Sequence, residues 1–409
     1  MKVLQVNCVY RKGSTGKIMA DIHEELLRQG VESVVCYGRG EVIDEPHVYK
    51  TCGELESKAN NLLTRFTGVM YGGLHAATHR LIEIIKKEQP DIVHLQCING
   101  YFVNIYELIT WLKEHRIKTV VTLHAEFMYT ANCGIALDCD RWQTGCGHCP
   151  RLRAETKTIF RDGTHESWQR MKDAFDGFAQ DCIVTSVSPW LMTRAEQSPI
   201  LRNLRHRSVL NGINTQIFHL WDTKDLREQY GFSENTPVVF HATAHFSPDP
   251  AHLKGGARVL ELAKRMPEVR FLVAGEHDAD IPLPPNVILL GRLADQTTLA
   301  QYYSMADVTL LTSKKETFSM IVAESLCCGT TVVGMKAGGP ESIALPGCSA
   351  FVEQDDLDGM EQEVRRILAA SPDRAAISRA GIAAYSSQAM CAADRNVYAE
   401  LLNGSDKTP

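Results

Sequence analysis

The sequence of 409 residues contains no run of about 18 apolar residues, so we expect no membrane-spanning helix. Its first residues, MKVLQVNCVY, lack the charged segment and the small-residue cleavage site of a signal peptide. Long basic runs are also missing and the formal net charge is −6, which argues against a nucleic-acid partner. These features indicate a globular protein, long enough for two domains, that stays in the cytoplasm.

Thirteen cysteines, an odd number without a signal peptide, favour reduced thiols over a disulfide framework. Four of them, Cys133, Cys139, Cys146 and Cys149, form a C-x5-C-x6-C-x2-C array. The closing C-x2-C resembles half of a zinc ribbon, in which thiolates bind a tetrahedral Zn²⁺ and order a polar loop. A structural zinc site is therefore predicted, and two disulfides or four buried free thiols are the alternatives.

The most informative stretch, residues 306–341, reads ADVTLLTSKKETFSMIVAESLCCGTTVVGMKAGGPE. Its pattern predicts a buried strand at 308–311, a polar loop, a helix from about 317 to 328 and a second strand at 330–333. Ligands of open α/β sheets bind where parallel strands end, so the loop between the strand and the helix is a candidate binding site.

Two glutamates of this stretch are separated by seven residues: Glu316 precedes the predicted helix and Glu324 lies in its second turn. Between them, the free N–H groups around Phe318 and Ser319 and the positive end of the helix dipole favour a bound phosphate. Two carboxylates that accept sugar or ribose hydroxyls beside an anion site describe a nucleotide-sugar pocket. The alternative is a pair of solvated surface charges.

The E-x7-E spacing between a strand and a helix resembles the retaining glycosyltransferases of family 4, including members that build bacterial exopolysaccharides of the colanic-acid type. The resemblance implies the GT-B architecture, in which two doubly wound, Rossmann-like α/β domains face each other across a cleft. The segment NGIN at 211–214 resembles the interdomain segment of that family. We therefore expect an acceptor-side domain at 1–210, a donor-binding domain at 211–384, and a helix at 385–409 that crosses back to the first domain.

A glycine-rich turn containing Gly13 and Gly16 joins the first predicted strand to a helix. It is not a Walker A loop, because Arg11 and Ile18 stand where that motif needs Gly and Ser or Thr. Bare backbone at such a turn can approach a phosphate or a sugar, and the turn matches the N-terminal glycine loop of the resembled family. A tight connection without a ligand is the alternative.

The predicted strand at 118–123 ends in His124, Ala125 and Glu126, at the edge where parallel sheets present functional residues. In the resembled family a histidine at this place, usually followed by Asp, lies close to the transferred sugar. Here Ala125 stands in place of that Asp. The resemblance therefore implies a role near the sugar for His124, and Glu126, one residue after Ala125, is the candidate acidic partner. A purely structural histidine is the alternative.

Lys254 lies just before a helix predicted at 257–265. In the resembled family this lysine and an arginine a few residues earlier bind the donor pyrophosphate. Pro248 occupies the place of that arginine, so His245 or Lys254 alone is expected to take the role.

Residues 55–88 form a long amphipathic segment, predicted as two helices. Core packing is one use of its apolar face, and contact with a membrane surface near a lipid-linked acceptor is the other.

The resemblance implies retaining transfer of a hexose-type sugar from a UDP- or GDP-sugar to a lipid-linked glycan in surface polysaccharide biosynthesis, at the inner face of the cell membrane and without a catalytic metal. A nucleotide-sugar epimerase or phosphorylase of the same fold, or an inactive nucleotide-binding scaffold, are the alternatives. The residues that it implies are His124 and Glu316 for catalysis, and Gly13, Gly16, Lys254, Phe318, Ser319 and Glu324 for donor binding.

Overall fold

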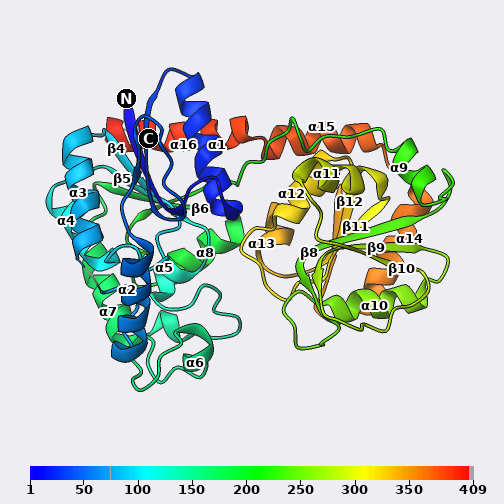
Figure 1. Ribbon diagram of the computed structural model, residues 1–409, viewed down its shortest axis with the longest axis horizontal. Coiled ribbons are helices and arrows are strands. Elements are labelled where there is room, and N and C mark those ends of the chain that lie inside the picture. The colour runs from blue at the N-terminus through cyan, green and yellow to red at the C-terminus, as the bar shows by residue number, and fades with distance from the viewer. Residues whose placement is uncertain (74, 405–409) are drawn as a thin grey trace. The chain divides into compact units, whose positions relative to one another are not determined.

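The computed structural model describes residues 1–73 and 75–404. They form two compact units (Figure 1). The N-terminal unit contains Met1–Leu210 together with the residues from Met390 onward, and the C-terminal unit contains Asn211–Ala389. Each unit is built around its own parallel β-sheet.

The sheet of the N-terminal unit has seven strands in the order β3-β2-β1-β4-β5-β6-β7, and each pair of neighbours is parallel. The direction of strand order reverses between β1 and β4. Such a switch point opens the sheet edge to ligands, because the loops after the two strands diverge. The strands are β1 (Lys2–Val9), β2 (Glu32–Arg39), β3 (Val48–Lys50), β4 (Ile92–Leu95), β5 (Thr119–Leu123), β6 (Cys182–Ser186) and β7 (Arg205–Ser208).

Helices alternate with these strands, and their starts carry familiar capping residues. The Asn104 side chain accepts from Glu107 N at the start of α4, and Ser188 accepts from Leu191 N at the start of α8. The segment predicted as two helices at 55–88 is α2 followed by α3. The helices are α1 (Gly13–Arg28), α2 (Glu54–Thr67), α3 (Ala76–Glu88), α4 (Ile105–Glu114), α5 (Phe127–Thr130), the 3₁₀ helix η1 (Arg141–Gln143), α6 (Leu152–Glu155), α7 (Thr164–Phe175) and α8 (Pro189–Gln197).

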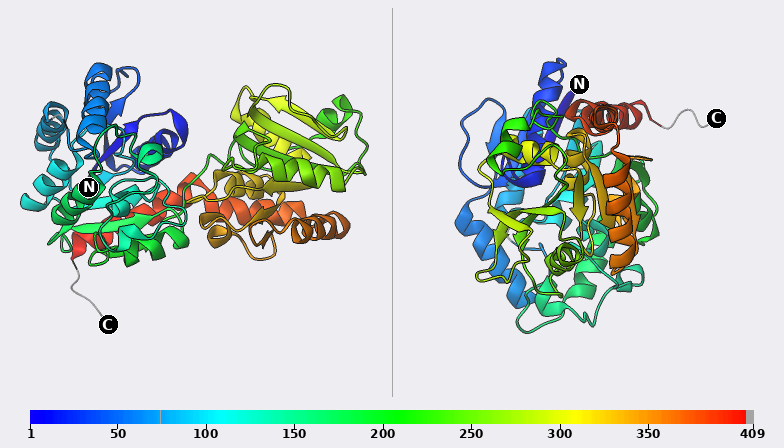
Figure 2. Two further views of the ribbon diagram at one scale, coloured as in Figure 1. Left: turned by 90° about the horizontal axis from the view of Figure 1, so that it is seen from below. Right: turned by 90° about the vertical axis from the view of Figure 1, so that its right-hand side faces the viewer.

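The last helix, α16 (Ser387–Asn403), contributes to the core of the N-terminal unit. Val397, Tyr398 and Leu401 of α16 are buried in one cluster with Val3 of β1 and Ile18 of α1. In the left view of Figure 2 the red helix runs beside the helices and strands of the N-terminal unit. No described helix, α16 included, is long and apolar enough to cross a membrane.

The C-terminal unit repeats the same strand pattern with six strands, in the order β10-β9-β8-β11-β12-β13, all parallel. Its switch point lies between β8 and β11. The strands are β8 (Val238–Phe246), β9 (Arg270–His277), β10 (Val287–Gly291), β11 (Val308–Leu311), β12 (Thr331–Met335) and β13 (Ser349–Val352).

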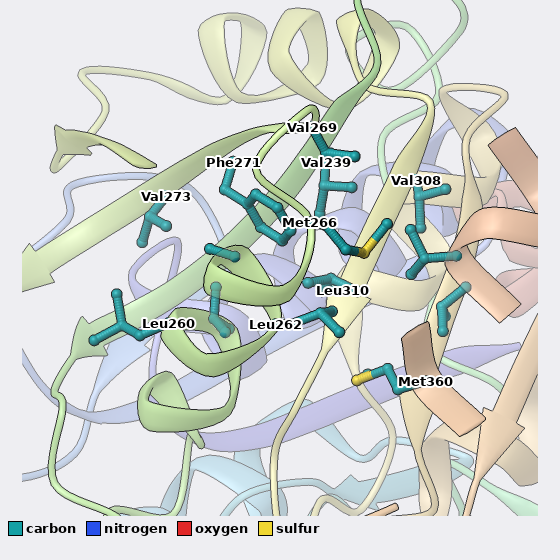
Figure 3. Close-up of a cluster of buried hydrophobic side chains, with 14 of the residues drawn as sticks. Val239, Leu260, Leu262, Met266, Val269, Phe271, Val273, Val308, Leu310 and Met360 are labelled. Carbon is teal, nitrogen blue, oxygen red and sulfur yellow. The ribbon is translucent and has the colours of Figure 1, made fainter. Parts of the chain in front are cut away.

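The core of the C-terminal unit lies between α10, α14 and the central strands (Figure 3). Leu260 and Leu262 of α10 meet Val239, Phe271 and Leu310 of the sheet in one buried cluster. Strands buried on both faces explain the continuous apolar runs from which β11 and β12 were predicted. The helices are α9 (Lys224–Gln229), α10 (Gly256–Arg265), α11 (Gln296–Met305), α12 (Met320–Cys327), α13 (Gly339–Ile343), α14 (Leu357–Ala370) and α15 (Arg374–Tyr385).

The helix predicted from 317 to 328 begins three residues later, at Met320 of α12. The reason is Ser319, whose φ of 87° lies outside the helical region. Gly329 follows the helix with a φ of 75°, the left-handed conformation expected there.

Candidate functional site

The switch point of the C-terminal unit brings together two side chains that are far apart in the sequence. Lys254 follows β8 and Glu316 follows β11, and the Lys254 Nζ lies 2.9 Å from the Glu316 Oε1. Ser313 donates a second hydrogen bond to the same oxygen at 2.7 Å. The Lys254 side chain is 40% exposed and that of Glu316 only 12%. The pair therefore presents a cation that solvent can reach, held by a nearly buried carboxylate.

Gly255 fixes the position of Lys254. Its φ is +69°, and a Cβ at this residue would lie 2.2 Å from the carbonyl oxygen of Thr312, at the end of the neighbouring strand. The Thr312 hydroxyl in turn donates to the carbonyl of Lys254 at 2.9 Å. Only glycine allows this close approach, so the Lys-Gly pair is a packing requirement that places the ammonium group at the sheet edge.

The second glycine-rich turn holds the backbone of Glu316. Glu316 N donates to Ala337 O, and Gly339 N donates to Glu316 O, both at 2.9 Å. A Cβ at Gly339 would lie 2.3 Å from the carbonyl of Thr317, so the two loops touch along their backbones. Glu341 accepts from Ala337 N and Gly338 N and closes the turn. The turn therefore fixes the backbone of Glu316, from which the carboxylate extends.

Ser319 stands immediately before α12 in a strained backbone conformation. Its hydroxyl is buried and has no hydrogen-bond partner among the described residues, and it does not cap the helix. Phe318, the residue before it, is buried at 4% exposure. The N-terminus of α12 therefore combines uncapped N–H groups with an unpaired hydroxyl, which suits an anion.

Glu324 lies within α12 and is buried. The Tyr303 hydroxyl donates to its Oε2 at 3.1 Å. Burial, together with the negative charges of Glu324 and Glu316, raises the pKa of Tyr303 well above its ordinary value. Tyr303 therefore holds the Glu324 carboxylate by a hydrogen bond.

His241 and His245, both on β8, differ in their surroundings. His241 is buried, its Nδ1 lies 3.2 Å from Leu310 O, and its Nε2 has no partner among the described residues. Burial lowers the pKa of His241 to about 4, with further effects from the charges of Lys254 and Glu316. His241 was not predicted from the sequence, although a histidine inside an apolar strand can indicate a functional residue. His245 instead lies 2.7 Å from the carboxylate of Asp278.

In the N-terminal unit, the glycine-rich turn leads from β1 directly into α1. Gly13 has a φ of +65° with open space where a Cβ would stand, whereas a Cβ at Gly16 would lie 3.1 Å from the Cγ2 of Val9. Arg11 N donates to Gly16 O at 2.9 Å, and the helix N-cap Lys12 provides no side-chain cap. The first turn of α1 is therefore open to a ligand at the Gly13 side, while Gly16 serves packing.

His124 follows β5 and is half-buried. Its Nε2 lies 3.3 Å from the Oε1 of Gln96, and Gln96 donates to Gln5 at 2.7 Å. Burial lowers the pKa of His124 to about 4, so the ring is neutral at neutral pH. A neutral imidazole at this edge can donate or accept a hydrogen bond to a sugar hydroxyl.

Glu126 is not the acidic partner of His124. Its side chain is fully buried, where it accepts from Arg194 Nε at 2.6 Å, from the Tyr129 hydroxyl, and from Ala136 N. These contacts satisfy the carboxylate and tie the following loop to α8. Glu126 is a structural residue, because it holds the loop that carries the four cysteines.

Cys133, Cys139, Cys146 and Cys149 all line one cavity of about 30 Å³, and all four are free thiols. Burial raises the pKa of Cys133 and Cys146 to about 12, so both are protonated in the absence of a cation. The donor set fits zinc, but in the described residues no three potential ligands are placed around one point. Zinc ligation therefore stays a prediction.

We predict that the purified protein carries about one zinc per chain, because four thiolates bound to one ion would hold the two ends of this loop together. Elemental analysis is the measurement. The double substitution Cys146→Ser with Cys149→Ser should remove the metal, whereas Cys348→Ser, in the other unit, should leave it bound. Folded, metal-free protein with all four thiols open to titration would contradict zinc ligation.

Comparison with known proteins identifies relatives of both units. Residues 15–148 match Glycosyltransferase Family 4, and residues 256–370 match Glycosyl transferases group 1. The WcaC protein of Escherichia coli (strain K12), named as a colanic acid biosynthesis glycosyl transferase, is 23% identical over 421 residues, which cover 98% of this chain and 100% of WcaC.

Two solved structures share the fold. Sucrose-phosphate synthase from Thermosynechococcus elongatus superposes with a TM-score of 0.67 at 16% identity, over 98% of this chain and 99% of that chain. Anabaena HepE in complex with UDP-glucose gives 0.63 at 14% identity, over 98% and 100%. The chain therefore belongs to the glycosyltransferases with the GT-B fold, with a family 4 domain in its N-terminal unit and a group 1 domain in its C-terminal unit.

Proposed function

We propose that the protein transfers a hexose-type sugar from a UDP- or GDP-sugar to a lipid-linked glycan acceptor, with retention of configuration, in surface polysaccharide biosynthesis on the cytoplasmic side of the membrane. The observation that carries the proposal is the 2.9 Å contact of Lys254 with Glu316 at the switch point, beside the uncapped start of α12. The name of WcaC, a colanic acid biosynthesis glycosyl transferase, supports polysaccharide biosynthesis, and the complex of HepE with UDP-glucose supports the donor class.

In this proposal Lys254 binds the donor diphosphate together with the backbone N–H groups at Phe318 and Ser319. An ammonium group and fixed amide dipoles are suited to this role, because they stabilise negative charge without reorganising. Glu324 accepts hydrogen bonds from the ribose hydroxyls, and Glu316 accepts from a hydroxyl of the transferred sugar. Each carboxylate is already held in place, Glu324 by Tyr303 and Glu316 by Ser313.

The reaction requires no base from the protein. The bond between the sugar C1 and the diphosphate oxygen breaks, the acceptor oxygen bonds to C1 on the same face, and the acceptor proton passes to the departing diphosphate. The protein contributes by positioning both substrates and by stabilising the charge that develops on the diphosphate. Neutral His124 and the turn at Gly13 are the groups of the N-terminal unit that we assign to the sugar and the phosphate.

A product assay tests the proposal. The purified chain is incubated with UDP- or GDP-hexoses and a lipid extract that contains oligosaccharide carriers, and both nucleotide release and the anomeric configuration of the product are measured. We expect release that depends on the acceptor and a new linkage with the donor's configuration. Inverted product, or turnover of the donor alone to an epimer, would reject retaining transfer.

A further inference from the structure

The helix α2 has its polarity reversed relative to an ordinary surface helix. The residues that it buries are polar: Ser57, Asn60 and Thr64. Ser57 donates to Gly100 O at 3.3 Å and Asn60 to Tyr101 O at 3.0 Å, so this buried face is hydrogen-bonded to the protein. A surface helix normally packs its apolar stripe against the protein core. In α2 the polar side chains take that place.

The apolar stripe of α2 points to solvent. Leu55, Leu62, Leu63 and Phe66 recur at helical spacing and are exposed by 81%, 53%, 42% and 51%. Because the spacing places them on one side, opposite the buried polar residues, they form one continuous strip rather than scattered apolar positions.

A second segment extends this strip. Ile159 and Phe160 are exposed by 50% and 79%, and Ile159 N donates to the carbonyl of Arg65 at 3.0 Å. The rings of Phe66 and Phe160 stack with their centroids 6.2 Å apart. Two elements separated by about ninety residues of chain thus form one apolar surface, which we call the α2 face: Leu55, Leu62, Leu63, Phe66, Ile159 and Phe160.

Exposed basic residues interleave with the α2 face. Lys58 lies on the exposed side of α2 and Lys157 is exposed shortly before Ile159, whereas Arg161, after Phe160, pairs with Glu166 at 2.7 Å. The acidic residues of α2 are engaged elsewhere, since Glu54 accepts from Gly40 N at 2.9 Å and Glu56 pairs with Arg80. Leucine and phenylalanine with lysine at the margin is the composition of a surface that enters the headgroup region of an anionic bilayer.

We propose that the α2 face docks on the surface of a bilayer that contains anionic lipid, with Leu62, Phe66 and Phe160 in the interface and Lys58 and Lys157 at the phosphates. A second copy of the chain fits the face less well. A two-fold contact through it would place Lys58 and Lys157 of both copies in one interface, without a carboxylate among the six residues of the face to pair with them. The inference deepens the proposed function, because a lipid-linked acceptor is reached at such a surface.

Vesicle sedimentation tests the inference without donor or acceptor, so its failure is distinguishable from failure of the proposed function. The full chain is mixed with vesicles of phosphatidylcholine alone or with phosphatidylglycerol. We expect binding to the anionic vesicles that weakens as salt is added. Phe66→Ser with Phe160→Ser should lower the partition coefficient by at least about tenfold, because two exposed aromatic anchors are lost.

Matched controls distinguish vesicle binding by the α2 face from nonspecific hydrophobic adsorption and from nonspecific electrostatic attraction. Val42→Ser removes a side chain that is 77% exposed in the same unit but outside the face, and it should bind as the parent does. Lys58→Glu with Lys157→Glu should abolish the preference for anionic vesicles, whereas Lys86→Glu, on α3, should retain it.

Three results would overturn the inference. The parent chain could stay in the supernatant with anionic vesicles, or the double serine variant could bind as tightly as the parent. The third is a parent dimer, seen by sedimentation equilibrium, that the double serine variant converts to a monomer while neither binds vesicles. That result would assign the face to contact between copies. Circular dichroism and the melting temperature of each variant, expected to match the parent since the changed residues are exposed, show that loss of binding is not loss of fold.

Discussion

Replacing Lys254 with alanine should raise the dissociation constant for UDP or GDP by about 10- to 100-fold, the usual effect of removing one charge-assisted hydrogen bond. The Lys254 side chain is 40% exposed, and its ammonium group is anchored by Glu316 at the sheet edge. Isothermal titration calorimetry with each nucleoside diphosphate measures the change. Turnover should fall as well, because the same charge stabilises the departing diphosphate.

The control for Lys254 lies on the adjoining helix. Lys264, in the last turn of α10, is 63% exposed and pairs with Glu261, so Lys264→Ala removes an equal charge remote from the switch point. It should bind nucleotide as the parent does. Lys254→Arg should recover part of the lost affinity, since it restores the charge with a different shape. Equal affinity of Lys254→Ala and the parent would show that the diphosphate binds elsewhere.

Glu316→Gln is expected to lower kcat by about 100-fold, the scale of losing one preorganised electrostatic contact, with a smaller change in the donor KM. The substitution removes the charge that holds Lys254 at 2.9 Å while keeping the side-chain shape. Glu324→Gln should instead raise the donor KM at least as much as it lowers kcat, because we place Glu324 at the ribose. Steady-state kinetics over a range of donor concentrations separates the two patterns.

A surface glutamate provides the comparison for this pair. Glu353 is 74% exposed and pairs with Lys336, and Glu353→Gln should leave both kinetic constants unchanged. If Glu316→Gln and Glu324→Gln were also fully active, the two glutamates would be structural charges rather than substrate ligands. A loss of stability in Glu324→Gln, measured as a lower Tm, would assign that residue to the Tyr303 contact instead.

The sequence predicted those parts of the molecule that depend on local pattern. Both sheets follow from apolar runs such as Val308–Leu311, which are continuous because parallel strands are buried on both faces. The E-x7-E pair was located in the segment that follows a predicted strand, and the Lys-Gly turn by its place just before a predicted helix. Lys254 contacts Glu316 because the strands that precede them, β8 and β11, are neighbours at the switch point of the sheet.

The features that the sequence did not predict depend on partners far away in the chain. Glu126 follows a strand end like a catalytic acid, yet Arg194 and Ala136 N make it structural. His241 was overlooked because its environment comes from Leu310, on another strand. The late start of α12 results from the backbone of Ser319, which side-chain periodicity does not report.

The contribution of α16 to the N-terminal unit has a consequence for the order in which the chain can fold. The Tyr398 hydroxyl lies 2.7 Å from the Nδ1 of His94 on β4, a contact between residues 304 positions apart. During synthesis the C-terminal unit, Asn211–Ala389, is complete before the last helix has left the ribosome, whereas the N-terminal unit waits for it with the apolar surface around Val3 and Ile18 uncovered. The N-terminal unit, although it is synthesised first, can therefore complete its core only when the last residues of the chain are available.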